Sequence, residues 1–239
     1  MTGASYEGQR DFFDPELFQY PVHIIGMGGI GGTVALPLVK HGIRSELHLW
    51  DKDTLAAHNL PGQMMYRPRD LGASKIKAAA KILEDYKEPE LDIITHDYWV
   101  DEDTDFDFSG VVISGVDSMA ARNVIWPHLE FNPEVALYMD GRIGGEFAQL
   151  FTLDPNDDNA VNFYSKWLFG DDRATELPCS ARTNSYAPLI LASRIIMQLS
   201  LFARGEPTVL KIDDDIRHST METCTMTDGT ITIAQTAAL

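Results

Sequence analysis

The segment from Val22 to Asp53, VHIIGMGGIGGTVALPLVKHGIRSELHLWDKD, constrains the fold more than any other part of the chain. A short apolar run, a glycine cluster, a helix-like stretch and a second apolar run ending in acid predict a strand, a turn, a helix and another strand. Gly26, Gly28 and Gly31 fit G-x-G-x-x-G, and Gly29 adds one more glycine to the turn. Such a turn lets backbone N–H groups approach phosphates at the positive end of a helix. A plain tight turn is the alternative, because glycine has permissive dihedrals.

Apolar strand-like runs alternate with helix-like runs through the first two thirds of the chain. This alternation is typical of an α/β fold, Rossmann-like and doubly wound, with a mainly parallel sheet. Near the C-terminus, another apolar helix and the short runs VLKI and TITI predict an antiparallel extension of the sheet. The predicted strands are Val22–Gly26, Glu46–Trp50, Leu91–Thr95, Val111–Gly115, Val135–Asp140 and Glu146–Leu153, and the predicted helices are Ile30–His41, Ser74–Tyr86, Met119–Leu129 and Ala187–Arg204.

We expect one domain over residues 1–239, since domains commonly contain about 100–200 residues. A nucleotide-binding core would occupy about residues 20–153. A polar, turn-rich crossover loop would follow over residues 154–184, and the C-terminal helix and strands would occupy residues 185–239.

The charge of the chain argues against some classes of partner. Asp and Glu number 36 against 19 Lys and Arg, a formal charge of -17 that would repel a nucleic-acid backbone. No apolar run approaches the roughly 20 residues of a membrane-spanning helix. The N-terminus has no secretory signal pattern, and the two cysteines, Cys179 and Cys224, lie far apart in sequence. We therefore expect a cytoplasmic protein without nucleic-acid or membrane partners.

Three stretches together resemble the ThiF/MoeB/HesA family of ubiquitin-activating-enzyme-like adenylyltransferases. DKDTLAAHNLPGQMMYRPRDLGASKIKAA is similar to the family pattern D-x-D-x-(V/L)-x(3)-N-L-x-R-Q followed by G-x-x-K. ISGVDSMAARN resembles the family's apolar strand followed by an aspartate and an arginine, and CSARTNSYAPLILASRIIMQLSLFARG resembles its cysteine, loop and long apolar helix. The resemblance covers roughly residues 22–205. The matching residues are Asp51, Asp53, Asn59, Leu60, Gln63, Gly72, Lys75, Asp117, Arg122 and Cys179.

The resemblance implies adenylation of a carboxylate. In this reaction the C-terminal carboxylate of a ubiquitin-like or sulfur-carrier protein ending in glycine attacks the α-phosphorus of ATP, giving an acyl-adenylate and pyrophosphate. Such a transfer depends on positioning and on neutralising phosphate charge. By resemblance, Lys75 reaches the phosphates and Asp117 holds Mg²⁺. The nucleotide-binding residues would be Gly26, Gly28, Gly29, Gly31, Asp51, Asp53, Asn59, Gln63 and Lys75.

Each of these side chains also has an ordinary structural interpretation. Lys75 could be a solvated lysine at the start of a helix, and Asp117 could be a helix N-cap. Asp51 could bind ribose or merely end a strand. Asn59 could contact nucleotide or simply occupy a turn.

The chain departs from the family pattern at three places. Gly62 stands where the family has an arginine, which puts the activity in doubt unless Arg67 or Arg69 replaces it. No paired C-x-x-C motif is present, and two cysteines cannot form a four-thiolate zinc site, so we expect no zinc. The opening arginine motif has no clear copy. Arg10 stands at about the right distance before the first strand; in relatives that arginine reaches into the partner subunit's ATP site, which predicts a homodimer.

Two further classes of function stay open. A Rossmann-like oxidoreductase that binds NAD or FAD would explain the glycines and Asp51, but it gives Lys75 and Asp117 no role. A non-catalytic ThiF-like scaffold subunit would explain Gly62.

Cys179 aligns with a cysteine that some relatives use to accept the activated acyl group. A reactive cysteine needs exposure and nearby positive charge, whereas a structural one is usually buried.

Overall fold

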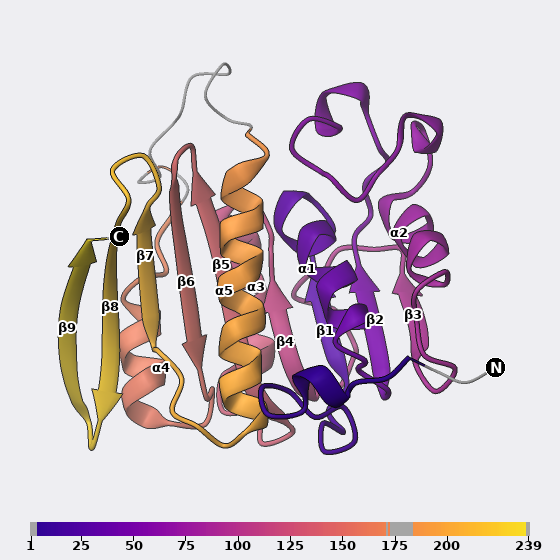
Figure 1. Cartoon of the computed structure of the whole chain (residues 1–239). Helices are drawn as coiled ribbons and strands as arrows, with labels where there is room; N and C mark the ends of the chain where they lie inside the picture. Colours follow the sequence, from indigo (N-terminus) through magenta and orange to yellow (C-terminus); the bar gives the residue numbers. More distant parts are fainter. Residues whose placement is uncertain (1–3, 171, 173–183, 238–239) are drawn as a thin grey trace.

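A computed structural model describes residues 4–170, 172 and 184–237, and within them it shows one continuous nine-stranded sheet (Figure 1). The strand order is β3-β2-β1-β4-β5-β6-β7-β8-β9. The strands are β1 (Val22–Ile25), β2 (Glu46–Trp50), β3 (Asp92–His96), β4 (Gly110–Ser114), β5 (Val135–Gly144), β6 (Phe147–Leu153), β7 (Lys211–Asp215), β8 (Thr220–Thr227) and β9 (Thr230–Ala237).

The strands from β1 to β5 form the parallel half of the sheet, and those from β5 to β9 form the antiparallel half. Every residue of β1 and β4 is buried, as expected of parallel strands with both faces covered. The predicted fold class, a Rossmann-like mainly parallel sheet with an antiparallel C-terminal extension, is confirmed.

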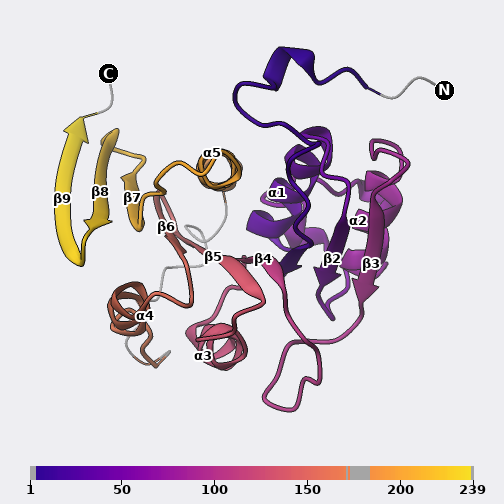
Figure 2. The ribbon, with the colours of Figure 1, turned by 90° about the horizontal axis from the view of Figure 1, so that it is seen from below.

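Helices cover both faces of the sheet (Figure 2). One face carries α1 (Gly29–Lys40), α2 (Lys75–Leu83) and α5 (Tyr186–Ala203), and the other carries α3 (Met119–Leu129) and α4 (Asp158–Ser165). Short 3-10 turns occupy Glu7–Gln9, Ala57–Asn59 and Pro68–Asp70.

The expectation that no apolar run is long enough to cross a membrane is wrong for α5, which in the described part of the chain is the one helix long and apolar enough to do so by length and composition. It packs against α1 and against β5 and β6. Its inward residues, including Leu191, Ile195 and Leu199, are buried in the main core. Because α1 and α5 cover each other, much of the apolar surface that the sequence assigns to them is used inside the fold.

Two hydrophobic clusters lie on the two faces of the sheet. Ile24 belongs to the cluster beneath α1, α2 and α5, and its neighbour Ile25 belongs to the cluster beneath α3 and α4. Successive strand residues point to opposite faces, so one short apolar strand supplies both cores.

The expectation of a surface loop over residues 154–184 is wrong for α4. The carboxylate of Asp157 accepts hydrogen bonds from the N–H groups of Asn159 and Ala160, each at 2.8 Å, and so caps the helix. Val161 and Tyr164 are buried against the sheet. The strand β8 also differs from the expectation, since only β7 and β9 were predicted beyond α5.

Candidate functional site

The glycine turn, residues 26–29, lies at the carboxyl end of β1 and leads into α1. Gly26 has a φ of 89°, in the left-handed region that favours glycine. A Cβ on Gly31 would collide with the carbonyl oxygen of Gly26, so α1 can approach β1 only because no side chain is there. Gly28 is the N-cap of α1. The N–H groups of a first helical turn have no intrahelical acceptor and are suited to bind an anion.

Asp51 follows β2 and binds the backbone of the glycine turn. Its side chain is buried, and its two oxygens accept hydrogen bonds from the N–H of Met27 and the N–H of Asp53, each at 2.7 Å. Burial raises the pKa of Asp51, while the two N–H donors and the Lys75 ammonium oppose that rise. Asp51 therefore does more than end a strand: it connects the glycine turn to the start of the following loop.

Lys75 is the first residue of α2, and its amine is directed toward the same aspartates. The Nζ atom lies 2.8 Å from Oδ2 of Asp53 and 3.7 Å from Oδ2 of Asp51. The lysine side chain is only 8% exposed, whereas that of Asp53 is 50% exposed. A buried ammonium next to a glycine turn is a compact positive charge for an anionic ligand.

The loop between β2 and α2 contains the predicted residues Asn59 and Gln63. Asn59 accepts a hydrogen bond from the N–H of Ala56 at 2.9 Å, which is a turn-stabilising contact and agrees with its structural interpretation. Gln63 lies beside the glycine turn, since a Cβ built on Gly28 would be 3.8 Å from its Nε2. The Oε1 atom of Gln63 is buried and has no hydrogen-bond partner among the described residues. This polar atom remains available to a ligand.

Gly62, which replaces the arginine of the family pattern, is buried against the glycine turn. A Cβ on Gly29 would lie 3.1 Å from the carbonyl oxygen of Gly62. Of the two proposed substitutes, Arg67 is occupied by Asp70, with Nε 2.9 Å from Oδ2, and Arg69 is exposed. Neither arginine is placed at the glycine turn by a contact with it.

Asp117 lies just beyond β4, at the same edge of the sheet as the glycine turn. Its side chain is exposed and has no hydrogen-bond or ion-pair partner within the part of the chain that the structure describes. It is not the N-cap of α3, because Ser118 holds that position and accepts a hydrogen bond from the N–H of Ala121 at 3.1 Å. The capping interpretation of Asp117 is therefore wrong, and its carboxylate is open to a cation.

Arg122 determines the path of the backbone around Asp117. Its guanidinium donates hydrogen bonds to the carbonyl of Val116 at 2.6 Å and to that of Ser118 at 3.0 Å, one on each side of Asp117. It also donates to the carboxylate of Asp140, which is completely buried, at 2.8 Å. Arg122 is thus a structural residue that shapes the loop carrying Asp117.

One of the predicted residues, Arg10, is not brought to this edge. Arg10 is followed by Asp14, with which it pairs at 3.5 Å. Its neighbour Gln9 donates to the carbonyl of His41, which is the C-cap of α1. A helix of 12 residues is about 18 Å long, so Arg10 lies roughly that far from the glycine turn of its own chain. Cys179 lies outside the described residues.

The second cysteine, Cys224, lies on β8 and is buried. Burial raises the pKa of its thiol, so it carries little of the thiolate that a nucleophile requires.

Sequence reasoning missed Tyr66 and the network around Asp140. The phenol of Tyr66 donates to the carbonyl of Met27 at 2.6 Å, and nothing in the spacing of this loop indicates that contact. Asp140 also accepts hydrogen bonds from Arg142 at 2.7 Å and Tyr164 at 3.0 Å. Charged residues within the apolar run YMDGRIG were a usable signal, since buried charges are paired.

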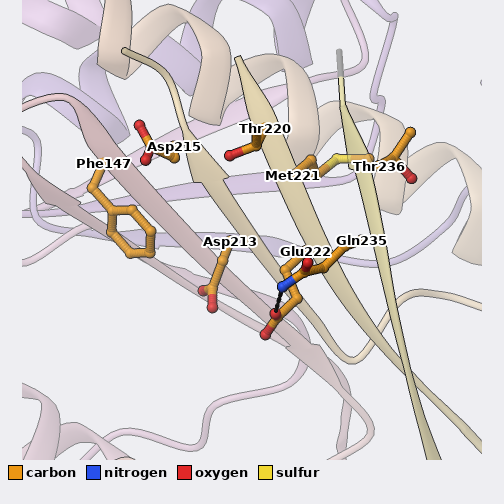
Figure 3. Close-up of a pocket in the computed structure, with 8 residues that line it drawn as sticks. All are labelled: Phe147, Asp213, Asp215, Thr220, Met221, Glu222, Gln235 and Thr236. Atoms are coloured by element: carbon orange, nitrogen blue, oxygen red, sulfur yellow. Dashed lines mark hydrogen bonds between the residues drawn. The ribbon is translucent and has the colours of Figure 1, made fainter. Parts of the chain in front are cut away.

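A cavity of about 440 Å³ lies elsewhere, over the antiparallel strands (Figure 3). Its carboxylates are engaged: Asp213 accepts from Gln149 at 2.8 Å, and Glu222 accepts from Gln235 at 2.8 Å. The strands β4 and β5 separate it from β1. None of the predicted site residues that the structure describes lines this cavity.

Comparison with protein families gives a match to the ThiF family over residues 10–132, just over half of the chain. The chain is 35% identical over 109 residues to the Nedd8-activating enzyme E1 catalytic subunit of Drosophila melanogaster, covering 44% of this chain and 23% of that enzyme. It is 29% identical over 112 residues to ubiquitin-like modifier-activating enzyme 5 of Culex quinquefasciatus, covering 46% of this chain and 28% of that enzyme. The chain therefore spans about a quarter of the length of these relatives.

Solved structures share the fold over a greater part of the chain. PaaA superposes with a TM-score of 0.62 at 18% identity, covering 92% of this chain and 64% of PaaA. MccB of E. coli, solved with ATP, superposes with a TM-score of 0.60 at 16% identity, covering 93% of this chain and 64% of MccB. At this identity the likeness concerns the fold alone.

Proposed function

Since the chain belongs to the ThiF family, which includes E1-like adenylating enzymes, we propose that it uses ATP to adenylate the C-terminal carboxylate of a protein or peptide. The observation that carries the proposal is the buried amine of Lys75 beside the glycine turn, with the carboxylate of Asp117, unpaired among the described residues, at the same edge of the sheet. Parallel α/β sheets bind ligands outside the carboxyl ends of their strands.

The proposed reaction makes one bond and breaks one. A carboxylate oxygen of the acyl partner forms a bond to the α-phosphorus, and the bond from that phosphorus to the bridging oxygen of pyrophosphate breaks. Pyrophosphate leaves with the electron pair. Negative charge is spread over the phosphate oxygens throughout, so preorganised N–H donors and cations are the groups that accelerate the transfer.

The residues of this chain would divide the work between them. Backbone N–H groups of Gly28 and Gly29 at the start of α1 would bind phosphate oxygens. Lys75 would move its amine from Asp53 to a phosphate, and Asp53 and Asp51 would face the ribose. The Oε1 of Gln63, which has no partner among the described residues, would accept a hydrogen bond from the nucleotide.

Asp117 fits a magnesium ion, because Mg²⁺ prefers oxygen ligands and often uses only one or two carboxylates together with phosphates and waters. Among the described residues no group of three or more His, Cys, Asp or Glu is arranged to hold a metal by itself. The ion would therefore be bound jointly by Asp117 and the nucleotide. When bound, it would neutralise phosphate charge.

The acyl partner that we propose is a ubiquitin-like or sulfur-carrier protein with a C-terminal glycine. Relatives of the chain include enzymes that activate ubiquitin-like modifiers and Nedd8. MccB, which shares the fold, has been solved with MccA. The proteins and peptides associated with these relatives support a protein or peptide carboxylate as the substrate.

We further propose that the protein is a homodimer. Arg10 lies near the end of α1 opposite the glycine turn of its own chain, which supports a role at the nucleotide of another subunit. Leu189 and Met197 on α5 are 44% and 40% exposed and give that helix an apolar outer surface. Light scattering in the presence of ATP should give twice the mass of the chain, and a monomer would contradict the dimer.

A non-catalytic scaffold subunit is a second candidate, because Gly62 removes one cation and Arg67 is held by Asp70. Such a subunit would bind ATP without exchanging pyrophosphate. Binding of NAD instead of ATP would favour the oxidoreductase alternative.

The test is ATP–pyrophosphate exchange with a candidate carrier and Mg²⁺. Lys75→Ala and Asp117→Ala should each lower exchange about 10²-fold or more, as expected for the loss of one preorganised electrostatic contact. Lys77→Ala is the matched control, since Lys77 lies on the same helix but its side chain is 66% exposed and pairs with Asp97. Exchange that survives both site variants, at the level of the control, would remove the proposed site.

A further inference from the structure

Hydrogen bonds hold the backbone of Met27 both at its N–H and at its carbonyl oxygen. Its N–H donates to Asp51 at 2.7 Å, and its carbonyl oxygen accepts from the phenol of Tyr66 at 2.6 Å. Both distances are at the short end for their donor types. The Met27 side chain is completely buried. We call Tyr66, Met27 and Asp51 the turn clamp.

The turn clamp restrains a segment that is rich in glycine. Met27 is the one residue of the glycine turn that has a side chain, and Gly26, Gly28 and Gly29 surround it. Glycine loses more conformational freedom on ordering than any other residue. Without contacts to Met27, the peptide planes of the turn can rotate between several orientations, and only some of them direct N–H groups outward.

Tyr66 also ties the glycine turn to the loop between β2 and α2. Its ring is 6% exposed, and a Cβ on Gly32 would touch it at 3.7 Å, so it packs on the first turns of α1. The base of this loop is closed by a bridge between Thr54 and Ser74, next to Lys75. The tyrosine therefore joins the two segments between which the proposed nucleotide would lie.

Tyr66 is the donor in its contact with Met27, because a carbonyl oxygen has no proton to give. Burial raises the pKa of its phenol well above the ordinary value, and the negative charge of Asp51 adds to the rise. The phenol keeps its proton under all ordinary conditions, so its contact with the carbonyl of Met27 does not change with pH.

We propose that Tyr66 is a positioning residue for nucleotide binding. By fixing the carbonyl of Met27 opposite the Asp51 contact, it holds the N–H groups of Gly28 and Gly29 toward the phosphates. This inference rests on the proposed function, since it assumes a nucleotide at the glycine turn. It assigns no contact with the nucleotide to Tyr66 itself.

The test uses Tyr66→Phe, which removes only the hydroxyl group. Tyr6→Phe is the matched control, because the phenol of Tyr6 donates to Glu88 at 2.8 Å in the N-terminal segment, away from the turn. Two quantities are measured on each full-length protein: amide hydrogen exchange of residues 27–29 without nucleotide, and the Kd for MgATP by calorimetry. Thermal unfolding of both variants checks that they are folded.

In Tyr66→Phe the amides of the turn should exchange about tenfold faster or more, and the Kd for MgATP should rise about three- to tenfold. That rise corresponds to a turn in the binding-competent conformation for about a third to a tenth of the time. Tyr6→Phe should change neither quantity, even if it lowers the melting temperature by the same amount.

The measurements distinguish failure of the positioning role of Tyr66 from failure of the proposed function. If wild type binds MgATP and Tyr66→Phe binds it equally well, Tyr66 is not a positioning residue. If wild type binds no nucleotide, the proposed function fails, and the positioning role fails with it. In that case faster exchange would still establish the clamp as a structural contact, whereas unchanged exchange would overturn the clamp as well.

Discussion

Acid should destabilise this protein through a buried histidine on the face of the sheet opposite α1, α2 and α5. His23 on β1 is 1% exposed and stacks on His48 with ring centroids 4.3 Å apart. Phe106 and Phe108 contact the same ring edge-on at 5.5 Å and 5.4 Å. Burial, followed by the charges of His48 and His96, lowers the pKa of His23 to about 3. The perturbation is His23→Met, which keeps a similar volume without a titratable group.

The sign and size of the effect follow from proton linkage. A folded pKa of about 3 against 6.5 in the unfolded chain means that only the unfolded state takes up the proton as the pH falls below 6.5. Stability from the neutral imidazole is therefore complete above that pH and is lost below it. Between pH 7 and pH 5 the free energy of unfolding should fall by about 2 kcal/mol on account of His23 alone.

The assay is urea unfolding followed by circular dichroism at pH 7, 6 and 5. The slope m of the unfolding free energy against urea concentration is compared between pH values to check that unfolding stays two-state. His23→Met should lose about 2 kcal/mol less than wild type over this range. His58→Met, which removes an exposed histidine, is the control and should follow wild type. A pH dependence of His23→Met equal to that of wild type would refute the reasoning, because it would mean that the buried ring is protonated without loss of folding.

Other substitutions test the packing and the chemistry. Gly31→Ala should lower stability by about 1–3 kcal/mol in thermal unfolding, because its methyl collides with backbone, whereas Gly8→Ala has open space and should change little. Arg122→Gln should lower the free energy of unfolding by about 3 kcal/mol or more, since it leaves Asp140 with a buried charge that has lost a partner; a loss below about 1 kcal/mol in urea would contradict this. Cys179→Ser should leave pyrophosphate exchange intact and abolish any thiol-sensitive adduct with the carrier, detectable by mass spectrometry. An adduct that persists in this variant would exclude Cys179 as the acceptor.

The parallel half of the sheet could be predicted from the sequence because its signals are local. The apolar run before Gly26, the helix after it and the run ending at Trp50 each carry their own periodicity, and the observed strand β2 has the predicted bounds. The turn clamp could not be predicted in this way. Tyr66 and Met27 are separated by 39 residues, and their contact depends on how the intervening loop folds back.

In the antiparallel half of the sheet, the strands depend more on their neighbours than on their own sequence. The strand β8 reads TMETCTMT, a weak apolar pattern, and it is held by hydrogen bonds to β7 and β9. Cross-strand pairing of this kind is decided by the neighbours rather than by the strand itself. In α4 a local signal existed, since Asp157 is a good N-cap, but the turn residues on both sides obscured it.

The charges around the glycine turn explain why its backbone matters so much in the proposed site. Lys75 is the buried cation that adjoins the turn within the described residues, and it is already paired with Asp53. Gly62 supplies no cation where the family pattern has one, so fewer side chains oppose the charge of a triphosphate. Binding then depends more on the N–H groups at the start of α1 and on a cation held at Asp117. We therefore expect ATP affinity to fall steeply without Mg²⁺ and to be sensitive to changes that loosen the turn, such as the loss of the Tyr66 hydroxyl.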